Sequence, residues 1–79
     1  MQTVIDFKLE ELGQGAYRVS EARVLGEEPQ GGMLLGGFDW AVRDACELLG
    51  LVGGEIVVVK AFASGGDLTL VAWLAGLPP

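Results

Sequence analysis

Hydrophobic and polar residues alternate at the start of the chain, in the segment TVIDFKLE at positions 3–10. A period of two residues is typical of a strand with one buried and one exposed face. The segment therefore predicts a half-buried strand. Its polar face carries Asp6, Lys8 and Glu10, and its apolar face carries Ile5, Phe7 and Leu9.

A second strand is predicted over 16–25, returning through the turn LGQG at 12–15. Its apolar residues change parity partway along, so a bulge near Ser20 or Glu21 is needed to bring them to one face. A short helix through SEARVL at 20–25 is the alternative interpretation.

The segment 38–49 changes to helical periodicity and ends at Gly50, a residue suited to the left-handed position after a helix. Asp39 and Glu47 each lie four residues from Arg43, a spacing that predicts ion pairs. Trp40 falls on the polar side, where it is either an interface anchor or covered by MLLGG at 33–37. The apolar side of this helix carries Phe38, Ala41, Val42, Ala45, Leu48 and Leu49.

The last third predicts a hairpin, with strands at 55–63 and 68–75 and a turn at Gly65 and Gly66. Pairing Ser64 with Asp67 sets the register. One face is then aliphatic and forms a platform for the helix. This face carries Val57, Val59, Ala61, Ala63, Leu68, Leu70, Ala72 and Leu74.

The opposite face of this hairpin is also mostly apolar, whereas a sheet that faces water alternates apolar and polar residues. It therefore needs a cover, which we expect to be the N-terminal hairpin, a second subunit or a ligand. With Trp40, these residues are the candidates for an interface or ligand site: Ile56, Val58, Lys60, Phe62, Val71 and Trp73.

These elements predict one small α+β domain over 1–79, of ββαββ order. We expect a four-stranded, mainly antiparallel sheet with one helix packed on one face. A closed barrel or sandwich of the two hairpins is the alternative. The open sheet exposes a large apolar patch around Trp73, so it predicts a homodimer, or a higher oligomer, that stacks two such faces.

The composition argues against some classes of binding partner. The net charge is −6 and the five basic residues are scattered, which argues against nucleic-acid binding. No apolar run is long enough for a membrane span, and no leader is visible, so we expect no membrane association and a cytoplasmic protein. The chain has no asparagine, which suits a thermophilic bacterial source, although chance accounts for it equally well.

The residue inventory argues against catalysis. With no histidine and a single cysteine, the chain has no Ser-His-Asp or Cys-His pair and no zinc cluster, so we expect no enzyme, cofactor or metal. Cys46 is expected to be an inert thiol. Lys60 is expected to extend to solvent or lie beside Trp73 rather than act as a nucleophile.

The sequence thus predicts a small, acidic, non-enzymatic domain that self-associates and acts as a protein-interaction or regulatory module. The alternative is a small-molecule-binding oligomer, with a pocket between helix and sheet or between subunits, near Trp40, Lys60 and Trp73. A weaker third hypothesis is that the acidic surface imitates nucleic acid.

Overall fold

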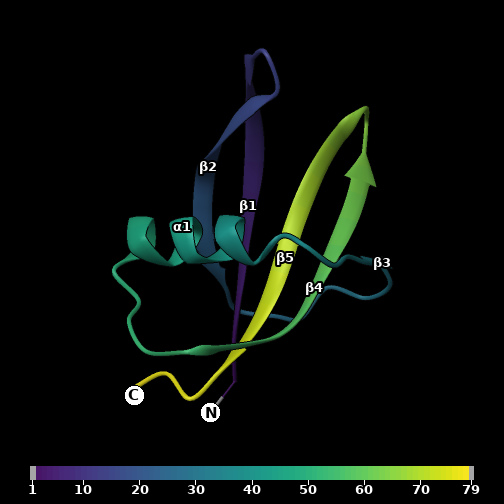
Figure 1. Cartoon of the computed structure of the whole chain (residues 1–79). Coiled ribbons are helices and arrows are strands. Elements are labelled where there is room, and N and C mark those ends of the chain that lie inside the picture. The colour runs from purple at the N-terminus through teal and green to yellow at the C-terminus, as the bar shows by residue number, and fades with distance from the viewer. Residues whose placement is uncertain (1, 79) are drawn as a thin grey trace.

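A computed structural model describes residues 2–78 as one antiparallel sheet of five strands with a single helix on one face (Figure 1). The spatial order of the strands is β2-β1-β5-β4-β3. The elements are β1 (Gln2–Gly13), β2 (Ala16–Leu25), β3 (Met33–Leu34), α1 (Asp39–Leu49), β4 (Glu55–Ser64) and β5 (Asp67–Ala75).

The predicted α+β class is confirmed, but the strand count and element order are corrected. A fifth strand, β3, precedes the helix, so the order is βββαββ rather than ββαββ. Met33 lies opposite Ala61 and Leu34 opposite Lys60, at the outer edge of β4. A strand of two residues is too short to show a period of two, so sequence patterning did not reveal it.

The N-terminal hairpin extends the sheet, because β1 pairs along its other edge with β5. The open-sheet prediction is therefore confirmed, and the closed barrel or sandwich is wrong. β2 is a strand throughout, which rules out the helix at 20–25. Its register shifts where predicted, and Glu21 takes a positive φ of 50° at the bulge.

The C-terminal hairpin has the predicted register: Ser64 lies opposite Asp67, and Val58 lies opposite Trp73. One bulge changes the assignment of faces. The register shifts between Ile56 and Val58, so Ile56 lies opposite Leu74 and packs on the helix side of the sheet. Its predicted place beside Trp73 is wrong, and so is the burial of Val57, which is 55% exposed.

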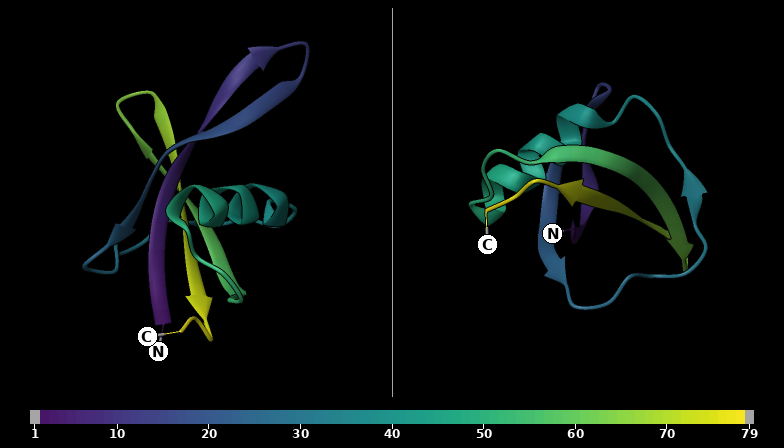
Figure 2. Two further views of the ribbon diagram at one scale, coloured as in Figure 1. Left: turned by 90° about the vertical axis from the view of Figure 1, so that its left-hand side faces the viewer. Right: turned by 90° about the horizontal axis from the view of Figure 1, so that it is seen from below.

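The helix has the predicted extent, and its end is fixed as expected. Gly50 has φ 71°, and the Leu51 N–H donates to the Cys46 carbonyl at 2.9 Å, so that Leu51 folds back onto the core. The helix crosses the strands at a steep angle (Figure 2, left).

The helix buries Ala41, Val42 and Ala45, but its platform is wider than predicted. The core beneath it joins the C-terminal hairpin to the N-terminal one, which contributes Ile5, Phe7 and Val19. The extra width follows from the pairing of β1 with β5, which places both hairpins in one sheet. The helix-side face is thus buried at its centre by residues from both halves of the chain.

Candidate functional site

Five of the seven predicted site residues lie together on the sheet face opposite the helix. Trp73 is only 5% exposed there, and Val71 is buried with it. Their cluster includes Val4 from β1, which the sequence did not assign to it. The large exposed patch predicted from the sequence is therefore absent from this face. The five residues are Val58, Lys60, Phe62, Val71 and Trp73.

The cover is the connection 26–32 between β2 and β3, here called the covering loop. The Trp73 indole N–H donates to the Glu28 carboxylate, and Pro29, Gln30 and Gly31 line a hollow with Trp73. Figure 2 (right) shows this connection on the side of the sheet away from the helix. This loop was not among the three predicted covers. Its residues are polar, and a polar sequence does not indicate that a segment packs over an apolar face.

Lys60 and Trp73 form the contact that the sequence suggested. The Lys60 Nζ lies 5.2 Å from the centroid of the Trp73 ring, within the range of a cation–π interaction. The lysine therefore extends along the covered face with its ammonium group over the ring. This arrangement favours the packing role over the nucleophilic one.

Trp40 lies apart from the other site candidates. It is on α1, across the sheet from Trp73, and is 43% exposed, so the segment 33–37 does not bury it. Within residues 2–78 of one chain, therefore, no single pocket between helix and sheet joins Trp40 to Lys60 and Trp73.

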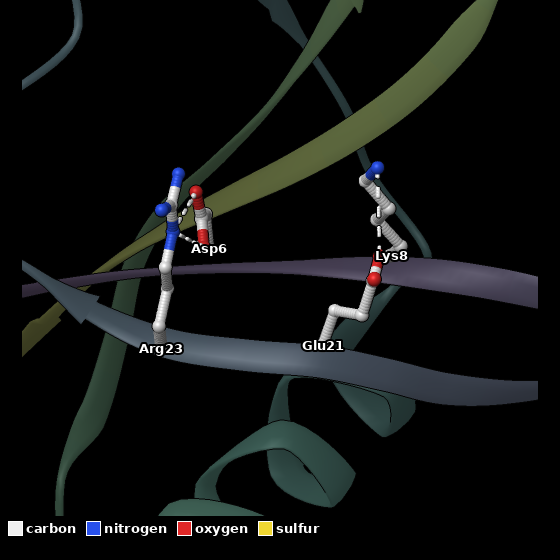
Figure 3. Close-up of polar contacts among 4 residues, drawn as sticks. All are labelled: Asp6, Lys8, Glu21 and Arg23. Carbon is white, nitrogen blue, oxygen red and sulfur yellow. Dashed lines mark hydrogen bonds and ion pairs between the residues drawn. The ribbon is translucent and has the colours of Figure 1, made fainter.

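The rest of the face opposite the helix is polar. Arg23 Nε donates to both carboxylate oxygens of Asp6, at 2.9 and 3.0 Å, and Lys8 pairs with Glu21 at 3.5 Å (Figure 3). Asp6 is 7% exposed, and its hydrogen bond and charge raise the pKa of Arg23. These cross-strand pairs compensate a buried carboxylate and favour the β1–β2 register, which is a structural role.

A groove of about 680 Å³ lies between the helix and the sheet, where the alternative hypothesis placed a pocket, but Ile56 is the one predicted candidate that lines it. One wall is the side of α1 that carries Cys46, and the other is the segment 51–56. Leu74 and Leu77 complete its apolar surface together with Val42, Leu51 and Ile56. Leu77 packs so close to Gly54 that a Cβ on that glycine would lie 2.8 Å from the leucine Cδ2.

The charged side chains around this groove are Asp39, Arg43, Glu47 and Glu55. Within residues 2–78, ion pairs form at Lys8, Arg18 and Arg23, and none forms at Arg43. The predicted pairs of Arg43 with Asp39 and Glu47 are therefore wrong. Spacing along a helix brings such side chains within reach, but exposed pairs gain too little to hold them together.

Cys46 is half-buried in the wall of the groove, and burial raises its pKa. The thiolate is the reactive form, so a raised pKa keeps the thiol unreactive near neutral pH, in line with the expected inert thiol. Because the folded-state pKa lies above the unfolded one, the neutral thiol is favoured in the folded chain. Stability therefore falls as pH rises through the ordinary thiol pKa towards the raised value.

We expect the pH at which Cys46 alkylation accelerates to be higher in the native chain than in the urea-unfolded chain. The reason is that burial disfavours the thiolate only in the folded state. Alkylation followed by mass spectrometry over a pH series measures both profiles, and the unfolded chain is the control. Coincident profiles would show that the thiol is not desolvated.

Residues 2–78 hold neither a metal-binding cluster nor a membrane-spanning helix. No three histidine, cysteine or carboxylate side chains among them are grouped so that they could hold a metal ion, and no helix there is long and apolar enough to cross a bilayer. No protein-family model, curated protein or solved structure matches the chain.

Proposed function

We propose that this chain is a non-enzymatic binding module that takes a small ligand in the groove between α1 and the segment 51–56. The observation that carries the proposal is the groove itself, in which an apolar surface lies beside charged side chains. Its volume, about 680 Å³, falls in the range of small-molecule sites. Binding sites of this class combine apolar walls with a few polar groups that orient the ligand.

The groove supports this function better than the Trp73 face supports self-association. The covering loop already occupies the apolar face that was expected to stack in a dimer. Association with a second copy or a protein partner remains a prediction, and for it we propose the sheet edge formed by β3 in place of the Trp73 face. Met33 and Leu34 are exposed there. Solution mass by light scattering tests self-association.

The single cysteine makes the groove testable. The test uses a panel of small molecules that share an apolar body and are anionic, cationic or neutral. We expect at least one of these three classes to slow the alkylation of Cys46 in a saturable manner. The ligand covers the thiol as it fills the groove. We also expect the compound to be recovered unchanged, as binding without turnover requires.

A matched pair of variants locates the binding. Val52 lies at the groove and is 77% exposed, so Val52→Trp should obstruct the groove and reduce protection of the thiol. Leu68→Trp adds the same ring at an exposed leucine beside the β4–β5 turn and should preserve protection. The proposal is wrong if no class protects Cys46 or if both variants behave alike.

A further inference from the structure

We infer that the groove selects amphipathic cations, meaning an organic ammonium group joined to an apolar body. The inference rests on the proposed function and adds the chemical class of the ligand. Two features support it: the balance of charge around the groove and the position of the apolar surface next to those charges.

The charge around the groove is predominantly negative. Three carboxylates line it, from Asp39 and Glu47 on α1 and Glu55 at the start of β4, against the guanidinium of Arg43. None of the four takes part in an ion pair within residues 2–78. The carboxylates are therefore not neutralised by close partners, and the excess of negative charge favours a cation.

The charge of the whole chain acts in the same direction. A net charge of −6 attracts cations and repels organic anions, and the effect is strongest at low ionic strength. Arg43 offers an anion one partner, but that anion would also approach the three carboxylates. An ammonium group is attracted by the three carboxylates and repelled by Arg43 alone.

The apolar body of the ligand has a surface to cover. Leu51, Ile56 and Leu77 are half-buried and present apolar surface to the groove, whereas Val42 and Leu74, which also line it, are already buried. The charged residues beside them are exposed, so an ammonium group there keeps part of its hydration while the chain attached to it contacts the apolar surface. An inorganic cation gains nothing from that surface, and for this reason we infer an organic amine.

Three probes with the same six-carbon chain separate head-group charge from apolarity: hexylamine, hexanol and hexanoate. The readout is the alkylation rate of Cys46 at one mildly alkaline pH, where the amine is protonated and hexanoate is ionised. We expect hexylamine to slow alkylation saturably, hexanol to act more weakly, and hexanoate to have the least effect. Added salt should reduce the difference in protection between hexylamine and hexanoate.

Neutralising one carboxylate of the groove tests the source of selectivity. We expect Glu47→Gln to weaken hexylamine protection about two- to fivefold, the range for one exposed charge pair. Protection by hexanol should not change. Glu11→Gln removes the same charge from β1, away from the groove lining, and should leave hexylamine protection unaltered.

The outcomes separate this inference from the proposed function. If hexanoate or hexanol protects as well as hexylamine, the groove binds ligands but the cation inference is wrong. Equal effects of Glu47→Gln and Glu11→Gln also overturn the inference, because the selectivity would then come from overall charge. If none of the three probes protects Cys46, the amphipathic-cation inference fails. The proposed function fails with it only if the wider panel gives no protection either.

Discussion

Replacing Trp73 with alanine is expected to lower the free energy of unfolding by about 3–5 kcal/mol, the range for removing a buried aromatic side chain. Trp73 lies near the C-terminal end of β5 and is 5% exposed, with its ring between the sheet and the covering loop. The substitution leaves a cavity beside Val4 and Val71 and removes the donor that bonds to Glu28. Urea unfolding followed by circular dichroism measures the loss.

Trp40→Ala is the matched control in the same chain. Its ring is 43% exposed on the helix, so we expect a change within about 1 kcal/mol, since exposed positions contribute little and alanine favours helix. If Trp73→Ala does not fold, Trp73→Phe keeps one apolar ring and removes the indole N–H together with the second fused ring. This variant should fold and lose less stability than Trp73→Ala. Similar losses for Trp73→Ala and Trp40→Ala would contradict the buried position of Trp73.

Trp73 also shows how far the sequence determined the site. Alternation within the hairpin, combined with a two-glycine turn, was enough to place Val58 opposite Trp73 and Lys60 opposite Val71. Both pairings depend on local spacing, which the sequence contains. The segment that covers these residues is far from them in the sequence, so local spacing cannot identify it. The covering loop also has almost no apolar side chains that would predict its packing on an apolar face.

Ile56 illustrates a second limit. A single bulge between Ile56 and Val58 moved Ile56 to the opposite face of the sheet, where it lines the groove. Strand periodicity cannot locate a bulge in EIVVVKAFA, because neighbouring valines and isoleucine are equally apolar on either face. The bulge in β2 was predictable because polar residues there interrupted the pattern.

A pocket between helix and sheet was the alternative hypothesis, but most residues that line the groove could not be predicted, because they come from distant parts of the chain. Cys46 comes from the helix, Ile56 from β4, and Leu77 from the segment after β5. Each of them has an ordinary apolar role when it is considered alone. Only Gly53-Gly54 gave a local signal, because a glycine pair before a strand permits another segment to approach closely, as Leu77 does at Gly54.

Replacing Gly32 with alanine is expected to lower the free energy of unfolding by about 2–5 kcal/mol, from two separate causes. Gly32 has φ +87°, which costs an L-residue about 1–2 kcal/mol. An added Cβ would also lie 2.5 Å from Phe62 Cζ, and such overpacking costs about 1–3 kcal/mol. Either the ring or the covering loop must then move.

The preceding residue separates these two causes. Gly31 has φ +84°, but a Cβ added there would have no atom within 4 Å, so Gly31→Ala should incur only the backbone cost. The difference between the two variants in urea unfolding then measures the contact between the covering loop and Phe62. If Gly32→Ala lifts the loop, Trp73 becomes accessible, and acrylamide should quench its fluorescence more strongly in a Trp40→Phe background. Equal losses with unchanged quenching would show that the loop does not press on Phe62, and that the apolar face around Trp73 is open to another cover.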